Sequence, residues 1–351
     1  HPARTHPADT AGLRPRLPDR PRARRRGARR PAGVRGRGQP RTSMPAGHAL
    51  RRRAAALLAA TALAAGCGSG SGQKQESALT GGDTGQAPVV AVKVGNAPEA
   101  RPQTGLDAAD LVYVAEVDEG LTGFTALYSG ELPDLVGPVT EVRETDLRLL
   151  RQFGRPAVAY AGVQGLLQPR VDAARLFAVP QSAASGAYEE HADRPAAHRL
   201  YVHPAAILEA APGASPPRDV GLRFGAAPRA GGEVAKHAEV SYPHAEVAFD
   251  WDAGREQWRI SLDGEAADLY ATTVVLQSVT VSQSRYHEAG AGSTPFSETV
   301  GAGEVTVLRE GMRFRGRWSR AKQAEATEFT TPGGDPLRLA PGPVWVVLAP
   351  R

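Results

Sequence analysis

Apolar residues in the first half of the chain recur with two different periods, which predicts strands alternating with helices. Short continuous or alternating apolar runs predict strands at residues 89–94, 111–117, 124–128 and 156–161. The clearest helix is predicted over 141–153, where apolar side chains share one face. A second helix, over 165–177, is expected to be broken by Pro169. Alternating strands and helices indicate a mixed α/β sheet.

Beyond residue 230 the pattern becomes alternation of apolar and polar residues, typical of antiparallel strands. One hairpin is clear, because residues 247–251 alternate toward a turn at 252–254 and residues 258–262 alternate back. Further strands are predicted at 272–281, 304–308, 312–318 and 344–348. A small antiparallel sandwich or half-barrel would bury such strands.

Clusters of proline and glycine at 212–217 and 226–232 mark a domain boundary near residue 230. The fold class predicted is therefore α+β. A mixed α/β N-terminal domain, residues 88–230, is followed by a mainly antiparallel β C-terminal domain, residues 231–351.

A short apolar run at residues 54–65 precedes Cys67, the single cysteine of the chain. Three arginines, 51–53, come before the run, and Gly66 precedes the cysteine, so residues 44–67 have the order of a lipoprotein export signal. A transmembrane helix would need about 20 apolar residues. We expect lipidation at Cys67, with a diacylglyceryl anchor holding the protein on the extracytoplasmic side of the cell membrane. A plain secretory signal is the alternative.

The segments on either side of this signal are too polar to form a core. Residues 1–43 are dominated by Arg, Pro, Gly and Ala. They are either a disordered basic arm that binds nucleic acid or an untranslated extension ahead of a true start at Met44, and we expect the second. Residues 68–87 are rich in Gly, Ser and Gln, which predicts a flexible tether reaching about 25 Å from the lipid.

The basic character of the chain comes from its first 67 residues. They hold 16 of the 42 basic and 2 of the 37 acidic residues, which leaves 26 basic against 35 acidic residues and a formal net charge of −9. This balance argues against nucleic acid as a partner. Without a second cysteine, the chain also has no internal disulfide and no zinc–cysteine site.

Most signatures of catalytic or metal sites are absent from the sequence. One S-x-x-K match, Ser319 to Lys322, resembles the motif of penicillin-binding proteins, but no K-T-G accompanies it and a chance match at a strand end is expected. His191, His198 and His203 are spaced too irregularly for one helix face, so an ordinary polar loop is expected there. We therefore predict no catalytic residue, no metal and no cofactor.

Charged residues near predicted strand and helix ends are the better candidates. Glu116 and the acidic residues just after it could serve as acid and base, although solvated charge at a strand end is the simpler interpretation. Arg101 lies between turns, and Arg143 lies in the first turn of the predicted helix, where it could help to hold an anion. Pairing of Arg143 with Glu141 or Glu144 explains it nearly as well.

Several motifs together resemble those of the YerB-like lipoproteins. They are N-A-P-E-A-R-P at 96–102, E-x-x-x-G-L-T-G-F at 116–124, G-P-V-T-E-V-R at 137–143, H-R-L-Y at 198–201, G-x-W-x-R at 316–320 and P-G-x-x-W at 341–345. The resemblance implies an exported two-domain lipoprotein of unknown biochemical function. The residues that match, Arg101, Glu116, Arg143, His198 and Tyr201, become candidates for one binding site in the first domain.

The chain departs from the family pattern at three places, the first being Arg199, which replaces the asparagine of the family's usual H-N-L-Y. Thr140 stands where the family usually has an arginine, and Tyr160 stands where a histidine commonly precedes the glycines.

Three hypotheses about the function remain open. The leading one is a non-catalytic module that binds an anionic small molecule or cell-wall fragment. The others are an envelope hydrolase using Glu116 and His198, and a structural or assembly protein.

Overall fold

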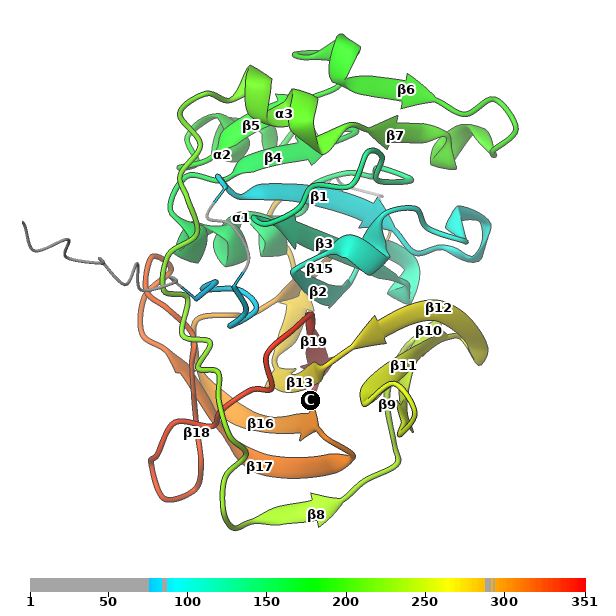
Figure 1. Cartoon of the computed structure of the whole chain (residues 1–351). Coiled ribbons are helices and arrows are strands. Elements are labelled where there is room, and N and C mark those ends of the chain that lie inside the picture. Colours follow the sequence, from blue (N-terminus) through cyan, green and yellow to red (C-terminus); the bar gives the residue numbers. More distant parts are fainter. Residues whose placement is uncertain (1–75, 84–86, 288–291, 293) are drawn as a thin grey trace, which may run out of the picture. The chain divides into compact units, whose positions relative to one another are not determined.

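Most strands in the described part of the chain join one large sheet that contains elements from both halves (Figure 1). The first half supplies β1 (Val90–Gly95), β2 (Leu111–Glu116), β3 (Thr122–Tyr128), β4 (Ala157–Tyr160) and β5 (Phe177–Pro180). The second half supplies β8 (Gly232–Val234), β13 (Thr273–Val279), β16 (Gly301–Arg309), β17 (Met312–Arg320), β18 (Glu328–Thr330) and β19 (Val344–Pro350). The strand order is β18-β17-β16-β13-β19-β2-β3-β1-β4-β5, and β8 pairs with β17.

The C-terminal strand β19 joins the two halves of this sheet. It pairs in parallel with β13 on one side and with β2 on the other, so that Val344 lies opposite both Thr273 and Leu111. Its first five residues are buried, as expected for a strand covered on both faces. The strand itself follows from its apolar run, whereas its parallel pairing differs from the antiparallel pattern predicted for the second half.

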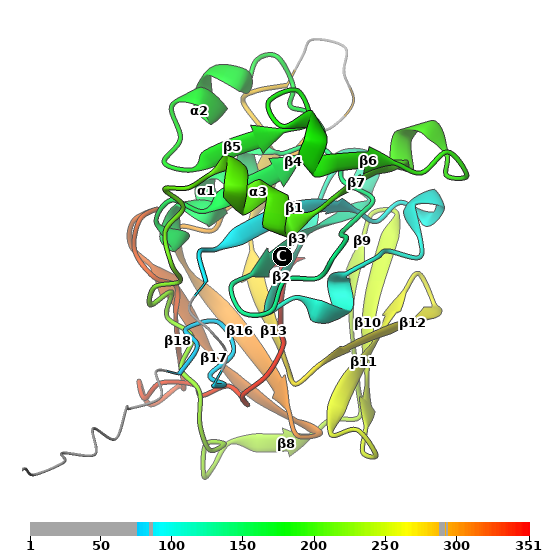
Figure 2. The same ribbon diagram turned by 45° about the horizontal axis from the view of Figure 1, so that its top comes forward.

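A second, four-stranded antiparallel sheet has the order β12-β11-β10-β9 (Figure 2). Its strands are β9 (His237–Tyr242), β10 (Ala245–Asp252), β11 (Gln257–Leu262) and β12 (Glu265–Ala271). The predicted hairpin is confirmed by the pairing of β10 with β11. Asp263 and Gly264 both have positive φ, 53° and 80°, which suits the tight turn between β11 and β12.

Within the described residues, the α-helices are short. They are α1 (Glu144–Leu150), α2 (Gln168–Asp172) and α3 (Pro204–Ala210). The predicted helix over 141–153 begins later because Arg143 is its N-cap, and the carboxylate of Asp146 accepts the Arg143 backbone N–H at 2.7 Å. Pro169 does not break a long helix but lies in the first turn of α2, where a missing N–H costs nothing.

The remaining elements are single turns and short hairpins. The 3₁₀ turns are η1 (Pro98–Ala100), η2 (Leu106–Ala108), η3 (Asp118–Gly120), η4 (Arg151–Phe153), η5 (Ser185–Ala187) and η6 (Ala196–His198). The two-stranded sheets are β6 (Tyr188–Glu190) with β7 (Leu200–Val202), and β14 (Val281–Gln283) with β15 (Pro295–Ser297). The N-terminal half thus has a mixed sheet with a few helices and the C-terminal half is mostly antiparallel, which confirms the α+β prediction.

Alternating side chains of the large sheet enter two separate apolar cores. In β1, Val92 and Val94 belong to one core and Ala91 to the other. The first core also contains Phe249 and Trp258 of the four-stranded sheet, and the second contains residues of α1 and η4. The large sheet therefore lies between the four-stranded sheet on one face and α1 on the other.

A charged pair is buried where α1 packs on this sheet. Lys93 of β1 and Asp146 of α1 are each 1% exposed. The Lys93 ammonium donates to Asp146 at 2.7 Å and to the hydroxyl of Thr125 at 3.0 Å, and that hydroxyl donates to the same carboxylate oxygen. A closed set of hydrogen bonds thus compensates both charges for the loss of water.

The computed structural model describes residues 76–83, 87–287, 292 and 294–351. The predicted extension, the export signal and Cys67 lie outside these residues. Within them, no helix is long and apolar enough to span a bilayer. Part of the predicted tether is described and packs on the fold, because Leu79 is fully buried and the Thr80 carbonyl accepts the Gly342 N–H at 2.8 Å.

Candidate functional site

The motifs of the N-terminal half that resemble the YerB-like family, at 96–102, 116–124, 137–143 and 198–201, meet at one small pocket, which we call the motif pocket. It has a volume of about 90 Å³ and is lined by Gly95, Asn96, Ala97, Val117, Leu121, Thr122, Gly123, Thr140, Glu141, Arg143 and His198. Two of the five predicted site residues, Arg143 and His198, therefore lie at the same pocket. Arg101, Glu116 and Tyr201 do not line it.

The charge of Arg143 is already matched by carboxylates. Its guanidinium forms an ion pair with Asp118 at 2.7 Å and another with Glu141. The pairing with Glu141 is the alternative that the sequence left open. Burial raises the pKa of Asp118, and the neighbouring Arg143 charge partly offsets this rise. With two carboxylates around one guanidinium, the motif pocket does not attract an anion.

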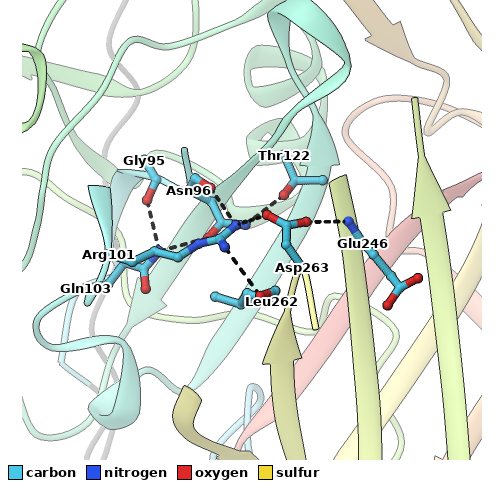
Figure 3. Close-up of polar contacts among 8 residues, drawn as sticks. All are labelled: Gly95, Asn96, Arg101, Gln103, Thr122, Glu246, Leu262 and Asp263. Carbon is cyan, nitrogen blue, oxygen red and sulfur yellow. Dashed lines mark hydrogen bonds and ion pairs between the residues drawn. The ribbon is translucent and has the colours of Figure 1, made fainter. Parts of the chain in front are cut away.

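Arg101 fastens its loop to the turn between β11 and β12 (Figure 3). Its guanidinium donates to the Asp263 carboxylate at 2.6 Å and to the Leu262 carbonyl at 3.3 Å. On the other side it donates to the side-chain oxygen of Asn96 at 3.0 Å and to the Asn96 carbonyl at 2.9 Å. Asp263 in turn accepts the backbone N–H of Glu246 at 2.7 Å. This network joins the N-terminal half to the four-stranded sheet.

The network also fixes one wall of the motif pocket. Asn96 is 2% exposed and donates to Thr122 at 2.8 Å, while its side-chain oxygen also accepts from Gln103 at 2.9 Å. Arg101 therefore supports the pocket through Asn96 without lining it.

Glu116 and Tyr201 do not line the motif pocket. Glu116 ends β2 opposite Thr122 and is partly buried, which raises its pKa. Tyr201 is 3% exposed, and its ring stacks on His191 with 4.1 Å between ring centroids. Its other neighbour is Gly137, where an added Cβ would lie 2.5 Å from the ring, so Tyr201 has a packing role.

Two histidines of this region, His191 and His203, contact one carboxylate. The two oxygens of Glu189 contact His191 Nε2 at 2.7 Å and His203 Nε2 at 3.2 Å, and these hydrogen bonds lower the pKa of Glu189. His198 is not part of this group. Across the described ranges, no cluster of three or more metal-ligating side chains is present.

The S-x-x-K match lies on an ordinary strand end. Ser319 is part of β17 and pairs with Ala302 and Glu328. Lys322 is 79% exposed in its side chain and forms an ion pair with Glu325 at 3.2 Å. A lysine in this position cannot act as a buried base for serine.

A cavity that the sequence did not predict gathers several arginines. This arginine cavity has a volume of about 260 Å³ and is lined by Glu144, Leu147, Arg148, Arg151, Leu167, Arg170, Ala173, Ala174, Arg175, Arg285, Tyr286 and Gln323. Five arginines and one carboxylate thus line one cavity, on a body whose formal charge after residue 67 is −9.

Two of these arginines have partners. Arg148 donates to both oxygens of Glu298 at 2.7 Å, and Arg170 donates to the Tyr286 hydroxyl at 2.6 Å. The one carboxylate of the cavity, Glu144, accepts the Ser284 hydroxyl at 2.6 Å. These contacts hold the cavity wall in place.

The other three arginines, Arg151, Arg175 and Arg285, have no ion pair or side-chain hydrogen bond to any described residue. Arg151 follows α1, Arg175 follows α2, and Arg285 lies between β14 and β15. No local sequence signal joins them, because Arg285 is more than a hundred residues from the other two. Only the fold brings these guanidinium groups to one cavity.

A buried arginine anchors α1 beside this cavity. Arg320 of β17 is 1% exposed and donates to the Arg148 carbonyl at 2.9 Å near the C-terminal end of α1. It also donates to the carbonyl of Gln323. Burial lowers the pKa of Arg320 to about 10, so the group stays charged at neutral pH.

The comparisons with known proteins agree with the motifs. Residues 76–216 match the N-terminal domain of a protein of unknown function, DUF3048, and residues 238–346 match the C-terminal domain of the same family. The predicted boundary near 230 lies between the two matched segments.

Two comparisons concern Bacillus subtilis. The chain is 44% identical over 64 residues to "Putative lipoprotein YerB" of strain 168, which is 18% of this chain and about a fifth (19%) of that relative's length. The crystal structure of the YerB protein has a TM-score of 0.67 and 20% identity, and the match covers 79% of this chain and 97% of that one. At this identity the structural match shows the fold alone. With both family domains matched in order, the chain belongs to the DUF3048 family of proteins of unknown function.

Proposed function

We propose that this protein is a membrane-anchored lipoprotein that binds an anionic ligand on the extracytoplasmic side without catalysis. The name of the relative, "Putative lipoprotein YerB", and the order of residues 44–67 both support the anchor. The ligand is an anionic small molecule or a cell-wall fragment, and its contacts are the guanidinium groups of the arginine cavity.

The observation that carries this proposal is a set of three arginines at one cavity, none of which has a charged or hydrogen-bonding side-chain partner among the described residues. Like charges brought together repel one another. Guanidinium groups in proteins usually pair with carboxylate or phosphate oxygens, to which they donate two parallel hydrogen bonds. An anion in the cavity would satisfy Arg151, Arg175 and Arg285 and relieve their repulsion. We therefore place the anion site in the cavity beside α1 and α2 and not at the five residues predicted from the sequence.

The predicted residues keep a smaller part in the proposal. We expect Arg143 and His198 to contact a small polar group in the motif pocket, because Arg143 is already neutralised there. Arg101 and Tyr201 support the surrounding loops. Binding is favoured over hydrolysis by Glu116 and His198, because only His198 lines the motif pocket.

Charge reversal at the cavity tests anion binding. Titration calorimetry of the full chain against phosphate, sulfate and citrate is expected to show binding of at least one anion, and Arg285→Glu should weaken it by at least about tenfold. Arg259→Glu is the matched control, because Arg259 is exposed on β11 and does not line the cavity. Absence of binding by all three anions, or equal losses in the two variants, would contradict the proposal.

The anchor is tested at Cys67. Cys67→Ser is expected to move the protein from the membrane fraction to the soluble fraction, because a thioether to diacylglycerol needs the sulfur. Mass spectrometry of the protein without this substitution should find the lipid adduct on an N-terminal Cys67. Recovery of Cys67 as a free thiol within an uncleaved chain would contradict the proposed lipid anchor. It would not affect the proposal of anion binding at the arginine cavity.

A further inference from the structure

We infer that the ligand of the arginine cavity belongs to the phosphate class, with two or more negative charges close together, and that it bridges the two matched domains. This inference rests on the proposed function, which requires only an anion. The phosphate class and the bridging of domains are inferred from three features. They are the number of arginines without a partner, the size of the cavity and the domains that supply its lining residues.

The free charge calls for a multiply charged ligand. Arg148 is neutralised by Glu298, so the remaining four arginines and Glu144 leave a net charge of about +3 around the cavity. One carboxylate would supply a single charge and two oxygens. One phosphate monoester supplies about −1.5 to −2 and three strong acceptor oxygens.

The size of the cavity favours a small ligand whose negative charges lie on adjacent groups. A volume of about 260 Å³ is near the lower end for small-molecule sites. Three carboxylates would need a carbon framework to carry them, whereas a diphosphate or two neighbouring phosphodiesters place their charges on adjacent groups. A ligand with neighbouring phosphate groups can therefore neutralise the free guanidinium groups in a smaller volume than a tricarboxylate.

The donors that face the cavity are also suited to phosphate oxygens. Each free guanidinium has five N–H donors and no acceptor. The Tyr286 hydroxyl accepts from Arg170 and keeps its own hydrogen to donate. Apart from Glu144, which is already engaged by Ser284, no carboxylate among the residues that line the cavity would repel the ligand.

The walls come from both matched domains. Arg151, Arg170 and Arg175 belong to the N-terminal segment 76–216, and Arg285 and Gln323 belong to the C-terminal segment 238–346. A ligand held by Arg151 and Arg285 together would tie the segments to each other. Ligand binding should therefore also raise the thermal unfolding midpoint, as for any ligand that binds only the folded state.

The test compares pyrophosphate with citrate on the full chain by titration calorimetry. We expect pyrophosphate to bind at least about tenfold more tightly, and Arg151→Gln and Arg285→Gln each to weaken it by roughly 10-fold to 100-fold. Arg259→Gln should leave it unchanged. The affinity should fall as ionic strength rises.

Other outcomes separate this inference from the proposed function. If citrate binds as tightly as pyrophosphate and both need Arg285, the phosphate class is wrong while anion binding stands. If Arg151→Gln weakens binding and Arg285→Gln does not, the bridge between domains is wrong. If neither anion binds, both proposals fail.

A competition experiment distinguishes two possible sources of the phosphate group, a phosphodiester polymer and a free phosphate compound. A soluble poly(glycerol phosphate) chain that displaces pyrophosphate, with loss in the Arg285→Gln variant, identifies a phosphodiester polymer as the source. Pyrophosphate binding that the polymer does not displace identifies a free phosphate compound. Both results support the phosphate class.

Discussion

Replacing Asp146 with alanine is expected to lower the free energy of unfolding by about 3–5 kcal/mol, because it leaves the Lys93 ammonium buried without a counterion. Both side chains are 2% exposed and their charged atoms lie 2.7 Å apart. Loss of the carboxylate that accepts the Arg143 N–H costs about 1 kcal/mol more. Urea denaturation followed by tryptophan fluorescence measures the change.

A double variant separates the buried charge from the lost packing. Lys93→Met with Asp146→Leu removes both charges and keeps apolar volume between β1 and α1. Apolar replacement of a whole buried pair is often neutral, so the double variant should lose no more than about 2 kcal/mol. A loss below about 1 kcal/mol for Asp146→Ala alone would show that Lys93 finds water or another partner.

Removing β19 by ending the chain at Gly342 is expected to abolish cooperative unfolding. The five residues Val344, Trp345, Val346, Val347 and Leu348 are each at most 2% exposed. Burial of such side chains stabilises a fold by about 1.5–3 kcal/mol each. Their sum, roughly 8–15 kcal/mol, is as large as the whole stability of an ordinary domain.

The position of β19 makes the effect reach both halves of the chain. Its removal would expose the ladder groups of β2 and of β13 at once. Circular dichroism and thermal melting of the truncated chain, beside a control lacking only Arg351, check the prediction. A sharp transition in the truncated chain at the control's temperature would show that the sheet does not depend on this strand.

Local patterns predicted most elements of the fold but not how they pair. The strands β1 to β4 and the β10–β11 hairpin follow from apolar periods, which depend only on neighbouring residues. The pairing of β19 with β2 joins segments more than two hundred residues apart, and an apolar run does not specify its neighbours. The prediction therefore identified β19 as a strand and missed that it joins the halves.

For the candidate site, local sequence likewise does not show which arginines have an acidic partner in the fold. The sequence favours Arg101 because it lies between turns and Arg143 because it lies at the start of a predicted helix, but each has an acidic partner in the fold. The partner of Arg101, Asp263, is 162 residues away. Free arginines such as Arg175 and Arg285 have no motif, and only the absence of a partner in the structure distinguishes them.

A crystal structure of the protein grown with pyrophosphate tests the central claim most directly. The account predicts density for the anion in the arginine cavity, with oxygens within hydrogen-bond distance of Arg151, Arg175 or Arg285. An anion bound instead by Arg143 and His198 in the motif pocket, or an arginine cavity that stays without the anion at saturating concentration, would contradict it.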